Sequence, residues 1–145
     1  MKKLIIAAML ATALAGCASV QKGDAQLDKE LKTFKAPTGD KTGVYIYRNE
    51  AFGASVTMDV SIDGKEVGQT AANTYLYKEV APGKHMVTSK AENTDTLEIE
   101  TQPGTLTYIW QEVKMGFMYA RNKLHLVDTE EGQKGVRETE LTVSK

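Results

Sequence analysis

Two histidines are the side chains of this sequence with the widest range of chemistry, and their surroundings predict structural roles. A transition-metal site needs several ligands of the histidine or cysteine type. Neither His85 nor His125 has a second such residue at ligand spacing. His125 alternates with Leu124 and Leu126, so we expect its ring to face away from the side that the leucines bury. The sequence therefore predicts hydrogen-bonded or surface histidines, with no metal and no cofactor.

Carboxylates are the other candidates for catalysis, and Glu98 and Glu100 are the best placed pair. They lie two positions apart in a predicted strand over residues 95–101, which puts them on one face roughly 7 Å apart, near glycosidase separations. Leu97 and Ile99 alternate with them, so the glutamates are expected on the exposed face. No serine lies in a G-x-S-x-G turn, and no glycine loop of the phosphate-binding kind is present. We predict that the protein is not an enzyme, with an envelope hydrolase as the least favoured alternative.

The single cysteine, Cys17, lies just after an apolar segment near the start of the chain. Two lysines, an uninterrupted apolar run over residues 4–14 and then small residues follow the order of a secretory signal peptide. The run is shorter than the roughly 20 apolar residues that span a membrane. Without a second cysteine, Cys17 has no disulfide partner within the chain. We therefore predict that residues 1–16 are a signal peptide and lie outside the fold.

Residues 14–17 read Leu-Ala-Gly-Cys and resemble the lipobox of bacterial lipoprotein precursors. This resemblance implies cleavage before Cys17, diacylglycerol on its sulfur and a further acyl chain on its new amino group. One acyl chain binds a membrane marginally and two signals anchor stably, so three chains would hold the protein at the bilayer. By the same resemblance, Ala18 in place of an aspartate points to the outer membrane. Residues 17–24 are predicted to be the lipidated cysteine and a short polar tether.

The segment from Trp110 to Arg121 is the candidate for a contact surface. Phe117 and Tyr119 flank Met118 in the predicted connection between two strands. If this connection is exposed, Trp110, Phe117 and Tyr119 would form an apolar contact patch with Arg121 as its polar anchor. The alternative is that the apolar side chains fold back over one end of the domain, and we favour this packing.

Four tyrosines form two pairs with a spacing of two residues, which places each pair on one face of a strand. Such a stripe is suited to stacking on glycans, but cross-strand or core packing is the commoner role, and we favour it. The four residues are Tyr45, Tyr47, Tyr75 and Tyr77.

Alternation of apolar and polar residues from residue 43 onward predicts an all-β domain over residues 25–145. Turn signals such as Asp63-Gly64 follow one another every 8–12 residues or so, as in β-sandwiches and small barrels. A short helix capped by Asp24 is expected before the first strand. We predict a single β-sandwich, or a small barrel, of seven to eight short and mostly antiparallel strands with a short N-terminal helix.

Three segments depart from simple alternation. Residues 44–47 are apolar on both sides, as in a strand that is covered on both faces. The apolar phase changes within residues 106–115, which indicates either a bulge near Trp110 or a strand shared between two packing surfaces. Residues 128–131 could be a capping box that opens a short helix, which Gly132 and Gly135 should weaken.

Two resemblances to known families follow from short motifs. Residues 61–68 (SIDGKEVG) and 80–85 (VAPGKH) are similar to hairpins of PEGA-type surface modules, which are small β-rich domains of bacterial envelope proteins. Residues 44–49 (VYIYRN), 111–116 (QEVKMG) and 121–124 (RNKL) resemble a domain family of unknown function common in bacterial lipoproteins. The second resemblance spans roughly residues 25–145. It implies an all-β domain on a lipid anchor, with no established catalytic residues.

Charge narrows the remaining classes of function. The chain has 18 basic and 19 acidic residues, a formal net charge of −1, and no basic stripe. Nucleic-acid binding requires concentrated lysine and arginine, so it is disfavoured. Together with what the lipobox resemblance implies, we expect a lipid-anchored lipoprotein of the outer membrane, facing the periplasm, that acts as a non-enzymatic binding or scaffolding module. Its partners would be envelope proteins, and glycan or peptidoglycan binding is the alternative.

Overall fold

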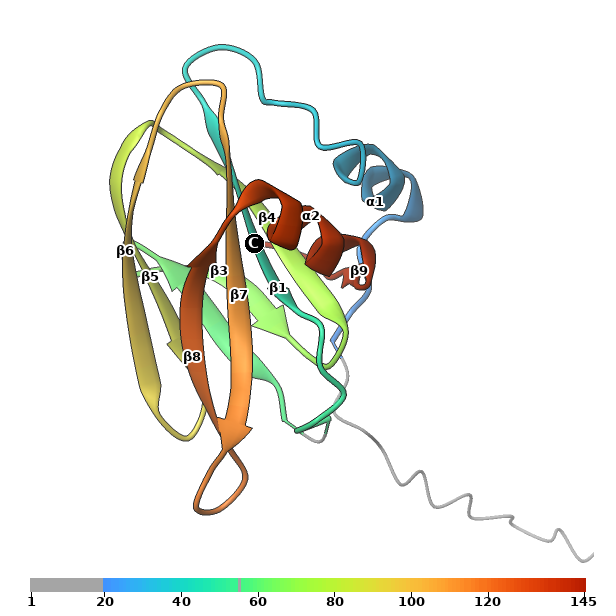
Figure 1. Ribbon diagram of the computed structural model, residues 1–145, viewed down its shortest axis with the longest axis vertical. Helices are drawn as coiled ribbons and strands as arrows, with labels where there is room; N and C mark the ends of the chain where they lie inside the picture. Colours follow the sequence, from blue (N-terminus) through green and yellow to red (C-terminus); the bar gives the residue numbers. More distant parts are fainter. Residues whose placement is uncertain (1–19, 55) are drawn as a thin grey trace, which may run out of the picture.

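The computed structural model describes residues 20–54 and 56–145, which form a two-layer β-sandwich with two short helices (Figure 1). Among these residues, nine strands lie in two sheets that do not close into a barrel, which confirms the predicted all-β class. The elements in chain order are α1 (Ala25–Leu31), β1 (Thr42–Arg48), β2 (Met58–Ile62), β3 (Lys65–Thr70), β4 (Thr74–Val80), β5 (Gly83–Lys90), β6 (Thr94–Thr101), β7 (Leu106–Met115), β8 (Ala120–Val127), α2 (Thr129–Arg137) and β9 (Glu140–Leu141). The unexpected strand is β9, whose two residues are too few to show an alternation.

β1 is the central strand of the larger sheet, which has the order β8-β7-β1-β4-β9. It pairs antiparallel with β4 and parallel with β7, and β4 pairs parallel with β9. The smaller sheet has the order β3-β2-β5-β6 and is antiparallel throughout. Because β1 and β7 run in the same direction, their C-terminal ends lie at the same end of the sandwich. The hairpin between β7 and β8 extends from this end (Figure 1).

Every residue of β1 is buried, as predicted for a strand that is covered on both faces. Val44 and Ile46 point between the two sheets and belong to the main apolar core. Tyr45 and Tyr47 point to the opposite face and form a second core with Tyr75 and with Val136 of α2. The helices lie on this side of the larger sheet (Figure 1). Packing is therefore the role of these three tyrosines, as favoured from the sequence, whereas Tyr77, the fourth residue of the stripe, is only partly buried.

α2 begins where the sequence predicts a helix, with Asp128 as its N-cap. The Asp128 Oδ1 atom accepts the Glu131 N–H at 2.8 Å. Gly132 and Gly135 lie on the buried face of the helix, where a Cβ would overlap Tyr108 and Tyr47 respectively. These glycines lower the helix propensity of the segment, as expected, but they also allow close packing. Because they have no side chain, α2 can lie directly on the two tyrosines.

The change of apolar phase in β7 reflects two packing surfaces and not a bulge. The pairing of β7 with β8 runs without interruption from Tyr108 to Met115. Tyr108 faces α2, and Ile109 faces the interior between the sheets. The irregular register lies elsewhere, in the pairing of β2 with β3 between Val60 and Ser61. Apolar residues are therefore needed on both sides of β7, and strict alternation is lost.

Candidate contact surface

The β7–β8 hairpin is longer than the sheet that supports it. Pairing of β1 with β7 ends at Tyr47 and Trp110, whereas β7 and β8 stay paired as far as Met115 and Ala120. The last part of the hairpin is therefore a two-stranded ribbon without β1 beside it. Val113 and Ala120 of this ribbon are still buried against Met58 of the smaller sheet, and only the connection between β7 and β8 extends past the sandwich (Figure 1). This connection has no neighbouring strand of the same sheet against which side chains could fold.

Four large apolar side chains at the end of this hairpin are exposed. The exposed fraction is 92% for Phe117, 80% for Met115, 76% for Met118 and 55% for Tyr119. We refer to these four residues as the apolar tip. The favoured prediction, in which the segment folds back over the end of the sandwich, is therefore wrong. The hairpin carries these side chains beyond the surface that they were expected to cover.

The backbone of the tip is held by the carboxylate of Glu92, which lies in the turn between β5 and β6. Glu92 Oε1 accepts the Phe117 N–H at 2.8 Å and Oε2 accepts the Tyr119 N–H at 3.1 Å, while the Met118 N–H reaches both oxygens. Gly116 allows this approach, because a Cβ there would overlap the carboxylate. The three N–H groups, that of Tyr119 first, hold the pKa of Glu92 below its usual value. Glu92 reads as an ordinary turn residue, and no sequence signal connects it to a loop 25 positions away.

We expect Glu92→Gln to loosen the tip without unfolding the domain. The neutral amide oxygen is a weaker acceptor than a carboxylate, so amide hydrogen exchange at residues 117–119 should become several-fold faster at neutral pH. Because the pKa of Glu92 is lowered in the folded state, its contribution is complete above the unfolded pKa of about 4.3 and is lost as pH falls through the folded pKa. The wild-type tip should therefore lose protection under acid conditions, and the variant should change less. Glu98→Gln, on the exposed face of β6, is the matched control, and equal exchange in both variants would contradict the clamp.

Two basic residues, Lys114 and Arg121, lie at the base of the tip, next to the carboxylates of Glu112 and Glu92. Lys114 and Arg121 are paired directly across the two strands, and the next pair on the same face joins Glu112 to Lys123. Like charges in directly opposed positions destabilise a β-ribbon. Glu112 is engaged by His125 at 3.0 Å and by Lys114 at 3.4 Å. The ribbon therefore keeps two basic side chains side by side at a small cost to its own pairing.

The structure separates the four predicted contact residues into two places. Phe117, Tyr119 and Arg121 come together at the end of the hairpin, and all three are exposed. Trp110 lies farther back on β7, partly buried beside the second core. Its ring stacks on that of His125 with a centroid distance of 4.9 Å. Trp110 is therefore a packing residue of the outer sheet face and not part of the apolar tip.

The histidine and glutamates considered as candidates for metal binding or catalysis lie in hydrogen-bonded or exposed positions. His85 lies between Asp63 and the Ala81 carbonyl, with both ring nitrogens at 2.6 Å, and its hydrogen bond to Asp63 raises its pKa. Glu98 and Glu100 are exposed on β6, as predicted. Within the described part of the chain, no three metal-ligating residues lie close enough to hold an ion. Neither described helix is long and apolar enough to span a membrane.

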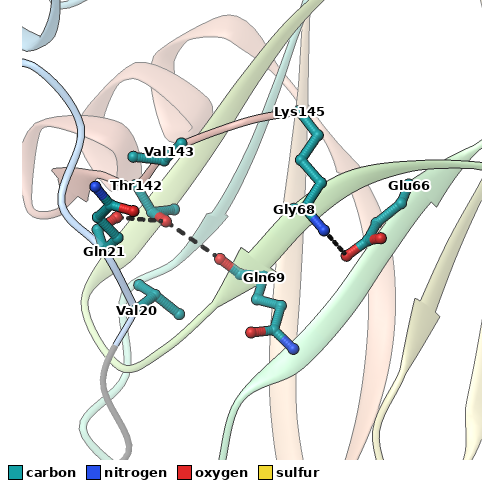
Figure 2. A pocket seen from close by; sticks show the side chains of 8 residues that line it. All are labelled: Val20, Gln21, Glu66, Gly68, Gln69, Thr142, Val143 and Lys145. Carbon is teal, nitrogen blue, oxygen red and sulfur yellow. Dashed lines mark hydrogen bonds and ion pairs between the residues drawn. The ribbon is translucent and has the colours of Figure 1, made fainter.

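Cys17 lies outside the described residues, but the segment that follows it joins the fold. Residues 21–23, which the sequence assigns to the tether, pair with the C-terminal segment through Gly23 N–H to Leu141 O at 2.8 Å and Val143 N–H to Gln21 O at 3.0 Å. A hollow of about 350 Å³ lies beside this junction (Figure 2). Figure 2 shows that chain ends and β3 line it, with an ion pair from Lys145 Nζ to Glu66 Oε1 at 3.1 Å. The hollow therefore lies where residues 20–21 and the C-terminal segment contact the smaller sheet.

Comparisons with known proteins place the chain in a family. The family described as "Protein of unknown function (DUF2846)" matches residues 38–123. A protein of Haemophilus influenzae, named "Uncharacterized protein", is 31% identical over 137 residues, which cover 93% of this chain and 81% of that protein. No solved structure matches the chain. The matched residues run from just before β1 to the middle of β8 and include the apolar tip, and the chain thus belongs to the DUF2846 family.

Proposed function

We propose that the protein is a lipid-anchored lipoprotein of the cell envelope, whose β-sandwich acts as a non-enzymatic binding or scaffolding module. The observation that carries the proposal is Cys17 at the end of Leu-Ala-Gly-Cys, directly after an apolar run that is too short to span a membrane. Diacylglycerol on the sulfur and an acyl chain on the amino group would together give stable attachment. By the lipobox resemblance, the attachment is to the outer membrane, with the domain facing the periplasm.

The start of the described chain supports this arrangement. Val20 is three residues after Cys17, so the two Cα atoms are at most about 11 Å apart. Residues 21–23 are already paired with the C-terminal segment, so a lipidated Cys17 would hold the sandwich close to the bilayer surface. The exposed apolar tip supports a contact function, because large apolar patches on soluble domains commonly mark interaction sites.

Labelled palmitate tests the anchor directly. We expect the wild-type protein to incorporate the label and to fractionate with the outer membrane. Cys17→Ala should abolish the label and remove the protein from the outer-membrane fraction, because the acyl chains that attach it there would be missing. Ser19→Ala is the matched control and should keep both the label and the membrane location. Equal labelling of wild type and Cys17→Ala would overturn the proposal.

A further inference from the structure

We propose that the apolar tip is a second membrane contact, which enters the surface of the lipid layer that holds the anchor. Met115, Phe117, Met118 and Tyr119 would lie among the headgroups and the first acyl carbons, and Lys114 and Arg121 would face lipid phosphates. The inference rests on the proposed lipid anchor.

The tip lies at the end of the domain where the chain emerges. Val20 lines a hollow together with the β3–β4 turn, residues 71–74. Thr74 pairs with Arg48 at the C-terminal end of β1, and β1 runs parallel to β7 toward the hairpin. Figure 1 shows the hairpin loop as the part of the described chain that extends farthest at this end, beyond the blue start of the chain. A bilayer that holds Cys17 within about 11 Å of Val20 is therefore within reach of the tip.

The composition of the tip matches a lipid interface. Phenylalanine and methionine partition into the apolar layer, and tyrosine is enriched at the level of the headgroups. Lysine and arginine side chains at the boundary extend their charged ends to the headgroups, and each contributes to attraction by anionic lipids. Lys114 and Arg121 lie opposite each other in the ribbon, where Glu112 and Glu92 compensate part of their charge, and a layer of phosphates would attract both side chains.

The clamp by Glu92 prepares the loop for such a contact. Backbone N–H groups are costly to bury in lipid without a partner. The N–H groups of Phe117, Met118 and Tyr119 already have one, the Glu92 carboxylate. The tip can therefore bury its side chains without breaking its hydrogen bonds. Its projecting form suits a deformable layer, whereas a protein partner would have to supply a matching groove.

Depth-dependent fluorescence quenching tests the inference on the full-length lipidated protein. Trp110 is the single tryptophan, so Trp110→Phe gives a background for one new probe at Phe117→Trp. The matched control is Leu126→Trp in the same background, an exposed site (59%) near the opposite end of β8. In vesicles of phosphatidylcholine and phosphatidylglycerol with brominated acyl chains, we expect at least twofold stronger quenching at position 117 than at 126.

The outcomes separate this inference from the proposed anchor. If the protein floats with the vesicles but both probes are equally unquenched, the tip does not enter the lipid while the anchor stands. That result is also the one expected if the tip serves a protein partner, since these vesicles contain none. If the wild-type protein does not float at all, the anchor itself fails. Should Trp110→Phe impair folding, an environment-sensitive dye on Phe117→Cys gives the same readout, because an acylated Cys17 sulfur does not react.

Discussion

Replacing Gly135 with alanine is expected to destabilise the domain by about 2 kcal/mol, although the same change within a helix normally stabilises it by about 1 kcal/mol. A Cβ at this position would overlap the Tyr47 ring, and Tyr47 is fixed in the central strand. The helix must then lift from the sheet, and contacts over the second core weaken. Thermal unfolding should show a melting temperature lower by roughly 5–10 °C.

The control for this prediction is Lys134→Ala, the neighbouring position on the exposed face of α2. Lys134→Ala also introduces alanine into α2, but at a position where the Cβ overlaps nothing. The free energy of unfolding of this variant should therefore stay within about 0.5 kcal/mol of that of the wild type. Gly132→Ala should behave like Gly135→Ala, because its Cβ would overlap Tyr108. If Gly135→Ala melted at or above the wild-type temperature, α2 would not lie against the sheet as described.

The β-strands were predictable because their signals are local. Residues 56–62 alternate because one face of the strand is buried and the other is exposed. The Asp63-Gly64 pair indicates a tight turn, and both of its residues have positive φ. The cap at Asp24 was predictable for the same reason, since its carboxylate accepts the Leu27 N–H three residues away. The end of this helix has no comparable signal: α1 ends at Leu31, and Phe34 takes a positive φ.

The parts that the sequence left open depend on contacts between distant residues. Phe117 is exposed because the β7–β8 pairing continues beyond the last residue pair of β1 and β7. The local composition does not encode this difference in length between the two pairings. The Glu92 clamp joins two turns 25 positions apart. Gln111 reads as a polar strand residue, yet it is buried and donates to Ser89 at 2.7 Å across the interior. Distant pairing thus decides the contact surface, whereas local pattern decides the strands.

Arg48→Met is expected to cost about 3 kcal/mol, the largest effect of a single side chain predicted here. Arg48 ends β1 and is fully buried. Its guanidinium donates to the Val56 carbonyl at 2.7 Å and to the Gly53 carbonyl at 2.6 Å, so one side chain organises the loop between β1 and β2. Methionine fills part of the volume but removes both donated hydrogen bonds, so the Val56 carbonyl loses the guanidinium donor and the Gly53 carbonyl keeps only the Val56 N–H at 3.0 Å.

Lysine should rescue this site only in part, because its single ammonium group does not reproduce the planar fork that reaches two carbonyls. We expect urea unfolding of Arg48→Lys to fall between that of wild type and Arg48→Met, with faster amide exchange in the loop before β2. Arg137→Met is the matched control, since Arg137 is exposed on α2 and lies over the Phe34 ring at 4.9 Å, a contact worth about 1 kcal/mol or less. Equal stability of Arg48→Met and Arg137→Met would mean that the loop does not depend on Arg48, and the described end of the sandwich would then need another source of order.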